Sequence, residues 1–209
     1  MKIAIIAANG RAGKLIMNEA LERGIDVTAI VRDKTKINNS KAKVIEKDLF
    51  DLTKDDLKEF DTVVSAFGVW DEKELDKHSL VIEHLCKILS NTNIRLMIVG
   101  GAGSLYIDSR KQLMDNESFP EIFKPLAKSM SKAFNILKNN KDILWTYISP
   151  SADFQADGEK TGEYNIGNNE LLVNSKGESS ISYADYAIAF VNEIQNKKYL
   201  NQQITFCSK

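Results

Sequence analysis

The sequence contains no apolar run long enough to cross a bilayer, and no signal-peptide pattern precedes its first predicted strand. An excess of charge of one sign is also missing. The 28 basic and 29 acidic residues lie mixed along the chain and give a formal net charge of -1. This balance argues against a nucleic-acid surface or an anionic membrane surface as a partner. We therefore expect a cytoplasmic protein that binds neither nucleic acid nor membrane.

Cysteine is scarce, because Cys86 and Cys207 are the only two and show neither a CxxC pattern nor a metal-ligand spacing. The two histidines, His78 and His84, share a predicted helix, and their six-residue separation does not suit a common metal ion. The sequence thus predicts no metal site and two buried free thiols in a reducing compartment. At 209 residues without an internal repeat, the chain fits one α/β domain with a full core.

What the chain does contain is a strand, a tight turn and a helix start at its beginning. The apolar residues of 3–6 are typical of a strand buried on both faces, and Asn9, Gly10 and Gly13 follow before a helical pattern begins. Such a turn offers helix N-terminal N–H groups to a pyrophosphate, which glycine lets approach. The spacing Ala7-x-x-Gly10-x-x-Gly13 is one glycine short of the usual motif, so an ordinary strand-to-helix turn is the alternative.

The rest of the chain alternates predicted strands and helices, as a doubly wound parallel sheet does. Further strands are predicted at 27–31, 44–46, 61–66, 95–99, 143–149 and 203–207, and helices at 14–23, 119–138 and from residues 53, 71 and 182 onward. Pro125 is expected to kink or interrupt its helix, and turn residues predict a small hairpin within 161–175. We expect a single domain over 1–209, with 151–181 as a small substrate-side lobe.

The ends of the second and third predicted strands carry candidate adenosine contacts, because open α/β sheets bind ligands at their carboxyl edge. Arg32 lies about twenty residues past the glycine turn, where an Arg favours the 2′-phosphate of NADP. Asp33 blurs this preference, since a carboxylate there favours NAD, and a solvated turn is the alternative for Arg32. Asp48 is predicted to accept from the adenine amino group while Leu49 packs on the ring, unless both belong to a surface turn.

The ends of the fourth and fifth predicted strands carry small residues. Residues 66–68 would let ribose and pyrophosphate lie across the strand tip, and the glycine cluster around Gly101 indicates close approach on the nicotinamide side. Ser104 is the first hydroxyl there, and Tyr106 opens a long polar loop over 106–120 that we interpret as a wall of the substrate site. An irregular loop, with Ser104 as a turn residue, is the alternative.

Eight short stretches, in order over nearly the whole chain, carry a family resemblance. They are AANGRAG from Ala7, VRDKTK from Val31, KDLFD from Lys47, VVSAFG from Val63, VGGAGSL from Val99, LWTYISP from Leu144, GEYNIG from Gly162 and ISYADYAIA from Ile181. Together they resemble the atypical short-chain dehydrogenase/reductase group of NAD(P)H-binding proteins, and most of all its NADH-flavin reductase branch. NmrA-like regulators and biliverdin reductase B, a flavin reductase, are wider relatives.

The resemblance implies a Rossmann-like fold with one NAD(P) site. It places the cofactor along Asn9, Gly10, Arg11, Ala12, Gly13, Arg32, Asp48, Leu49, Ala66, Phe67 and Gly68, with Ser104 near the nicotinamide. The motif spacing and the glycine cluster add Ala7 and Gly101 to the expected cofactor contacts. The basic residues that follow VRD, Lys34 and Lys36, form a pattern that resembles that of NADPH-using relatives. We therefore expect NADP(H) to be preferred over NAD(H), with FMN or FAD as a potential substrate.

The Tyr-x-x-x-Lys pair of most short-chain dehydrogenases is missing, because Arg110 stands four residues after Tyr106 and Tyr183 and Tyr186 come too late in the chain. Without a lysine to lower a tyrosine pKa, alcohol or ketone chemistry is disfavoured. Hydride transfer to a flavin, quinone or similar planar acceptor needs less from the protein. We predict such an NAD(P)H-dependent reductase, a monomer or homodimer, in which Ser104 orients the nicotinamide or donates to the acceptor, and Tyr106 shapes the acceptor site.

Two other functions stay open at the level of sequence. A non-catalytic NAD(P)-binding redox sensor of the NmrA-like kind also needs no Tyr-x-x-x-Lys pair. A reductase should have an open apolar slot beside the nicotinamide, whereas a sensor should have that slot filled and an apolar surface patch instead. A sugar-nucleotide epimerase or dehydratase is less favoured, since it would require the missing pair.

Overall fold

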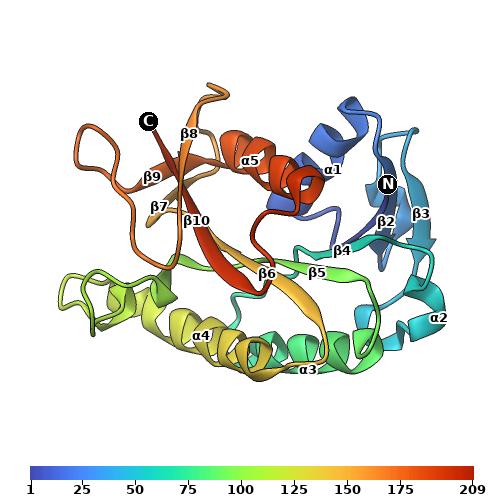
Figure 1. Ribbon diagram of the computed structural model, residues 1–209, viewed down its shortest axis with the longest axis horizontal. Helices are drawn as coiled ribbons and strands as arrows, with labels where there is room; N and C mark the ends of the chain where they lie inside the picture. The colour runs from blue at the N-terminus through green and yellow to red at the C-terminus, as the bar shows by residue number, and fades with distance from the viewer.

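Ten strands form one large and one small sheet in the computed structural model, which describes residues 1–209 (Figure 1). They are β1 (Lys2–Ile6), β2 (Asp26–Val31), β3 (Lys43–Glu46), β4 (Thr62–Ser65), β5 (Arg95–Val99), β6 (Leu144–Ser149), β7 (Asp153–Gln155), β8 (Tyr164–Gly167), β9 (Ser180–Ser182) and β10 (Gln202–Ser208). The large sheet has the order β3-β2-β1-β4-β5-β6-β10-β8, and only β8 runs antiparallel to its neighbour. Its first six strands follow the order of the Rossmann fold, which confirms the predicted fold class.

Helices cover both faces of the large sheet. The α-helices are α1 (Arg11–Glu22), α2 (Lys54–Leu57), α3 (Lys77–Leu89), α4 (Lys124–Asn139) and α5 (Tyr183–Asn196), and short 3₁₀ turns lie at Lys34–Lys36, Leu49–Asp51, Glu72–Glu74, Ala102–Ser104, Leu113–Asp115 and Glu121–Phe123. Helices α1 and α5 pack on one face, and α3 and α4 pack on the other (Figure 1). No helix has the length and apolar character needed to cross a membrane.

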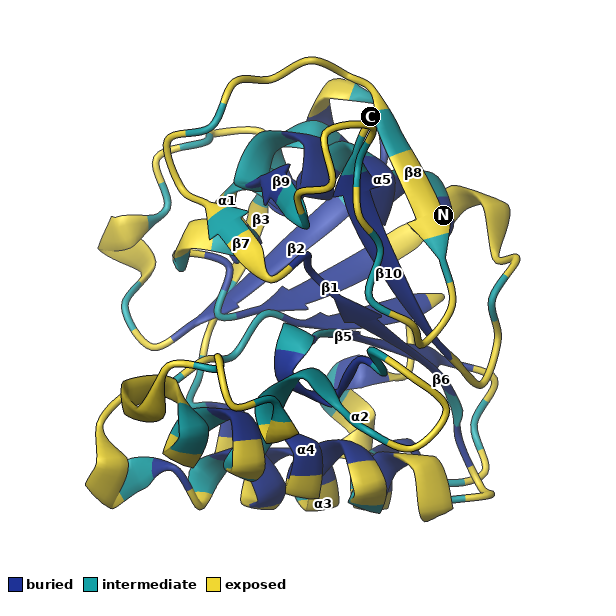
Figure 2. Cartoon of the chain, turned by 90° about the vertical axis from the view of Figure 1, so that its left-hand side faces the viewer, coloured by how far each residue is buried: buried dark blue, intermediate teal, exposed yellow.

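Strand β1 lies between the two halves of the core, as its apolar run at 3–6 predicts. Ile3 and Ile5 face the cluster beneath α1 and α5, while Ala4 and Ile6 face the cluster beneath α3 and α4. Figure 2 shows the central strands as the most buried layer, between helices whose outer faces are exposed. Because β1 is enclosed on both faces and paired with β2 and β4, the turn at its end has a rigid base.

Two predictions about local structure were wrong. Pro125 does not interrupt its helix, because it is the second residue of α4, where no intrahelical N–H is required. The predicted hairpin within 161–175 does not form either. Strand β8 instead pairs with β10 at the edge of the large sheet, and β9 pairs with β7 to make the small sheet. Part of the 151–181 segment thus belongs to the central sheet.

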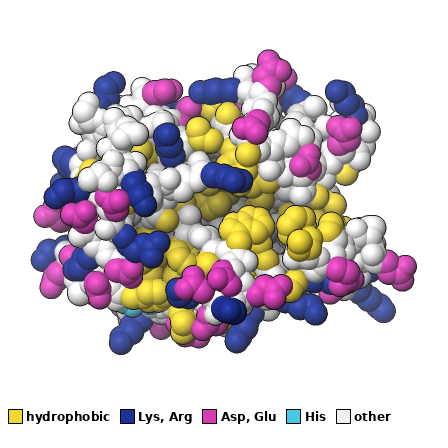
Figure 3. Space-filling model, turned by 180° about the vertical axis from the view of Figure 1, so that it is seen from behind, with side chains coloured by type: hydrophobic (Ala, Val, Ile, Leu, Met, Phe, Trp, Pro, Cys, Tyr) yellow, Lys and Arg dark blue, Asp and Glu magenta, His cyan; other side chains and the backbone are white.

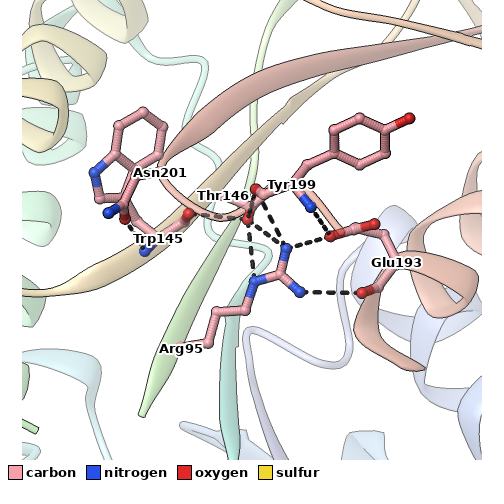
Figure 4. A network of polar contacts seen from close by, with 6 residues as sticks. All are labelled: Arg95, Trp145, Thr146, Glu193, Tyr199 and Asn201. Atoms are coloured by element: carbon pink, nitrogen blue, oxygen red, sulfur yellow. Dashed lines mark hydrogen bonds and ion pairs between the residues drawn. The ribbon is translucent and has the colours of Figure 1, made fainter. Parts of the chain in front are cut away.

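A buried ion pair anchors the C-terminal part of the chain to the start of the interior strand β5 (Figure 4). Arg95, at the start of β5, pairs with Glu193 of α5 and donates to its backbone oxygen at 3.0 Å. The Arg95 guanidinium also donates to the hydroxyl of Thr146, which in turn donates to the backbone oxygen of Tyr199 at 2.6 Å. This network fixes α5 and the segment that leads into β10.

Candidate dinucleotide site

The turn after β1 leaves the start of α1 without a cap. The Gly10 N–H donates to the Ala7 oxygen at 2.9 Å, which closes the turn, and Gly10 then precedes the first helical residue. No side chain accepts from the first N–H groups of α1, and no acidic residue lies in its first turn. These N–H groups, together with the positive end of the helix dipole, form a site suited to a phosphate group.

Gly13 is required because α1 lies directly against the end of β1. A Cβ atom at this position would lie 2.5 Å from the Ala7 oxygen, 3.0 Å from the Ala8 Cα and 3.2 Å from the Ala66 Cβ. At Gly10 the corresponding distance to the Ala7 oxygen is 3.2 Å. Ala7 itself has a φ of 57°, a left-handed conformation that glycine adopts more easily. The residue that departs from the glycine motif is thus the one under backbone strain.

Arg32 lies at the end of β2, at the adenosine side of the expected site. It is exposed and makes no hydrogen bond or ion pair with the rest of the protein. The carboxylate of Asp33 accepts from the N–H of Thr35 at 3.0 Å and from its hydroxyl at 2.5 Å, and these hydrogen bonds lower the pKa of Asp33. Asp33 therefore stabilises the turn that it begins, and the Arg32 side chain is the one available to contact a ligand.

Asp48 and Leu49 follow β3, and both side chains already make contacts within the protein. One carboxylate oxygen of Asp48 accepts from the Phe50 N–H at 2.9 Å, and Leu49 is buried in the core beneath α3. Residues 66–68 continue from β4, and the Ala66 N–H donates to Ile6, which keeps this segment against the end of β1. The adenosine contacts of these residues stay predictions, and the burial of Leu49 leaves little of its side chain for a ring.

The glycine cluster after β5 serves packing. A Cβ atom at Gly100 would lie 2.3 Å from the ring of Tyr147, and one at Gly103 would lie 2.8 Å from the Cβ of Ala127 in α4. The Gly101 N–H donates to the Tyr147 hydroxyl at 3.3 Å, and a Cβ there would lie 3.0 Å from a sulfur atom of α4. The cluster thus allows the β5 loop to lie against β6 and α4.

Ser104 and Tyr106, the two predicted catalytic residues, lie at and just after the 3₁₀ turn Ala102–Ser104. Ser104 is only 3 % exposed, and its hydroxyl accepts from the Gln203 side chain at 3.0 Å. Tyr106 is held by backbone bonds to Asn169 and Leu171, and it lines a hollow beside the starts of β6 and β10. Their catalytic roles stay untested predictions that these positions disfavour.

Aromatic side chains that the sequence analysis did not single out lie near the expected nicotinamide end. Trp70, which follows β4, is 69 % exposed and meets Phe123 edge to face at 6.3 Å. Phe123 precedes α4, and its neighbour Ile122 is also exposed. A small apolar hollow of about 20 Å³ lies nearby beneath the ends of β4 and β5, lined in part by Phe67. Viewed from behind, hydrophobic side chains surround a hollow across the middle of the molecule (Figure 3).

A second aromatic pair packs the C-terminal part of the chain against the glycine turn. The rings of Phe154 and Tyr183 are stacked, with centroids 3.6 Å apart and planes within 5°. Burial raises the pKa of Tyr183, and the guanidinium of Arg11, beside its hydroxyl, partly opposes this effect. Tyr183 is the first residue of α5, so this contact joins the starts of α1 and α5.

The sheet order, the uncapped start of α1 and the tight turn before it define a dinucleotide-binding protein of the Rossmann type. Comparison with known proteins agrees with this class. The profile of the NAD(P)H-binding family matches residues 7–197, and the chain belongs to that family.

Similar proteins match over the whole chain. The uncharacterised protein YwnB of Bacillus subtilis is 42 % identical over 212 residues, which cover 100 % of this chain and 99 % of YwnB. A crystal structure from Streptococcus pneumoniae, named as a candidate NADH-flavin reductase, is 48 % identical, with a TM-score of 0.95 and 100 % coverage of both chains. A candidate exported protein of Burkholderia pseudomallei is 36 % identical, with a TM-score of 0.89 and 99 % coverage of both chains.

Proposed function

We propose that this protein transfers a hydride from NADPH or NADH to a planar acceptor such as a flavin or a quinone. The observation that carries the proposal is the uncapped start of α1 at the same sheet edge as the exposed Trp70–Phe123 pair. The first feature suits a pyrophosphate and the second suits an aromatic ring. The 48 % identity to a protein named as a candidate NADH-flavin reductase supports the same reaction class.

The reaction asks little acid–base chemistry of the protein, and the described site offers little. A bound nicotinamide supplies the hydride, and an extended acceptor ring spreads the resulting charge. Burial raises the pKa of Tyr147 to about 12, so its hydroxyl stays protonated near neutral pH, and burial lowers the pKa of His78, which favours its neutral form. The residues of this chain then have three tasks: to hold the phosphates, to stack the acceptor and to exclude water.

For the cofactor we propose a preference for NADP(H), based on Arg32. Its guanidinium is free of partners, whereas the neighbouring carboxylate of Asp33 is engaged by Thr35. A 2′-phosphate would therefore meet a cation without a partner, whereas a 2′-hydroxyl would meet a carboxylate that already has one oxygen engaged by Thr35.

A redox sensor is the second candidate function, and one observation favours it. The hollow beneath β4 and β5 holds only about 20 Å³, far less than an isoalloxazine ring requires, while Trp70 and Ile122 present apolar surface to solvent. Such a surface would suit a protein partner as well as a planar acceptor. The two functions differ in whether bound NADPH is oxidised.

Calorimetric titration with NADPH and NADH, followed by addition of FMN or a quinone with the nicotinamide absorbance recorded, tests both points. We expect Arg32→Ala to weaken NADPH binding by roughly 10- to 150-fold, from the loss of about 1.5–3 kcal/mol, with little change for NADH. Lys41→Ala is the matched control, because Lys41 is an exposed lysine that follows this turn and forms no ion pair. Equal loss for both cofactors would refute the role of Arg32.

The acceptor is tested by turnover in Trp70 variants. Trp70→Ala should raise the KM for FMN without changing the affinity for NADPH, while Trp70→Phe should keep most of the ring contact. Tight NADPH binding without oxidation by any planar acceptor would contradict the reductase and favour the sensor. If neither cofactor binds, the dinucleotide site itself is wrongly assigned.

A further inference from the structure

A hollow of about 520 Å³ lies apart from the glycine turn, between the end of α4, the starts of β6 and β10, and the loop that contains Tyr106. Of its 13 lining residues, eight are Asn or Gln and two are Lys, and no Asp or Glu is among them. None belongs to the turn after β1 or to the segments that follow β2, β3 and β4. We call this site the amide hollow.

The largely buried Trp145 side chain lines the amide hollow, and its indole N–H has no hydrogen-bond acceptor within the protein. Trp145 is only 5 % exposed, and its indole N–H makes no hydrogen bond within the protein. Thr62 Oγ1 is the one side-chain polar atom that is both sealed from solvent and unpartnered, so the indole nitrogen keeps some accessible surface, and Trp145 lines the hollow. Nearly all buried donors in proteins have an acceptor. Because no group of the chain accepts from it, the indole N–H is left for water or for a ligand in the hollow.

The side chain of Gln203 is fixed in the same hollow. It is 8 % exposed, and its Nε2 donates to the hydroxyls of Ser104 and Ser149, each at 3.0 Å. Both of its amide hydrogens are thus used, and its amide oxygen has no protein partner. The oxygen is absent from the sealed atoms and faces the hollow. A fixed donor and a fixed acceptor stand in one wall, and neither can move to find another partner.

Lys138 and Lys141 bring positive charge to the rim of the hollow. Neither lysine forms an ion pair, and the hollow has no carboxylate of its own. Lysines near a helix C-terminus also interact favourably with the helix dipole, so charge alone would not define a site here. Combined with the fixed Trp145 and Gln203 groups, the two lysines indicate an anionic group on the ligand.

From this lining we infer that the amide hollow binds a small, polyhydroxylated anion of the sugar phosphate type, separately from the dinucleotide. Amide side chains both donate to and accept from hydroxyl groups, and lysine ammonium groups pair with a phosphate. The volume lies within the range of small-molecule sites. The site does not depend on the proposed reductase activity, because its residues lie outside the dinucleotide turn.

The indole N–H signals in a ¹H–¹⁵N spectrum give a direct test. The chain has two tryptophans, and Trp70→Phe leaves Trp145 as the single indole, which assigns both signals. Glucose 6-phosphate, glucose and inorganic phosphate are titrated separately into the wild-type protein saturated with NADPH and into the cofactor-free protein. We expect glucose 6-phosphate to shift the Trp145 signal in a saturable way and to leave the Trp70 signal in place.

Variants decide whether the amide hollow is responsible. The double variant Lys138→Gln/Lys141→Gln should weaken binding of glucose 6-phosphate by about tenfold or more. Lys132→Gln, on an exposed position of α4 outside the hollow, should leave the affinity unchanged. Glucose should bind more weakly than its phosphate ester.

Four results would overturn the inference. Inorganic phosphate binding as tightly as the ester would show simple attraction of an anion. Loss of the Trp145 shift in the NADPH-saturated protein would place the probe in the dinucleotide site. An equal effect of Lys132→Gln would show general charge attraction. The absence of any shift with all three probes would show that the hollow holds only water.

Discussion

The substitution Gly13→Ala tests the geometry that brings α1 against the end of β1. The added methyl group would lie 2.5 Å from the Ala7 oxygen, roughly 1 Å inside an optimal separation. The next atoms it meets belong to Ala8 and Ala66, so all three contacts involve backbone or a Cβ atom. None of them can rotate away, and the start of α1 must move outward instead.

Two opposing effects set the expected change in stability. Displacing α1 from a tightly packed contact costs about 1–3 kcal/mol, whereas alanine in place of glycine within a helix contributes about 1 kcal/mol. The protein should therefore stay folded, with a loss of at most about 2 kcal/mol. Cofactor affinity should suffer more, since the N–H groups of the first turn move with the helix. Loss of two charge-assisted hydrogen bonds, at about 1.5 kcal/mol each, predicts at least about 100-fold weaker binding of both NADPH and NADH.

Gly24→Ala is the matched control for this experiment. Gly24 ends α1 with a φ of 73°, and a Cβ atom there would meet nothing within 4 Å. Alanine at this position should cost about 1–2 kcal/mol from backbone strain alone and leave the phosphate site unchanged. Urea denaturation and calorimetric titration of both variants separate stability from binding. Wild-type cofactor affinity in Gly13→Ala, or an equal loss of affinity in Gly24→Ala, would refute the reasoning.

Three further substitutions test other parts of the structure. Glu193→Ala should cost about 3–5 kcal/mol in urea denaturation, because it leaves the Arg95 guanidinium buried and unpaired, and a double replacement by Met and Leu should recover most of this loss. The pKa of His78 is lowered in the fold, so the neutral form is favoured and stability should fall as the pH drops below about 6.5. His78→Gln should reduce this dependence in denaturation curves recorded between about pH 8 and pH 5, and an unchanged curve would contradict it. Ala7→Gly should raise the melting temperature by relieving a φ of 57°, with a gain of about 0.5–1 kcal/mol, and a lower melting temperature would show that the alanine is unstrained.

Local pattern was sufficient for the first half of the fold. The apolar run at 3–6, the glycine at position 24 and the Thr53–Asp56 pair each act through neighbours in sequence. The structure confirms a buried strand, a helix end with positive φ and a reciprocal capping box at these positions. Such features depend on hydrogen bonds and burial within one or two turns, which the sequence displays directly.

Contacts between distant segments could not be predicted in this way. Arg95 looks like an exposed charge at the edge of a predicted strand, and its burial depends on Glu193, which lies 98 residues further along the chain. The pairing of β8 with β10 likewise depends on an available strand edge that no local turn pattern records.

In the candidate site, too, features built from neighbouring residues were predicted and features built from distant residues were not. The turn from Gly10 to Gly13 was predicted because its residues are contiguous. The packing role of Gly100 was not, since the sequence gives no sign that the Tyr147 ring lies 2.3 Å from where a Cβ would stand. Trp70 and Phe123 come together from two separate loops, so only a three-dimensional arrangement shows them as a pair.

Strand β10 joins two strands that precede it in the sequence. This seven-residue strand, the last element in sequence, lies between β6 and β8 and supplies the main-chain partner of both. During synthesis, β6 therefore has an open edge and β8 has no strand to join until β10 has been made. A protein without β10 would expose that edge and lose the anchor of β8, so an intact β10 protects β6 from pairing with other chains.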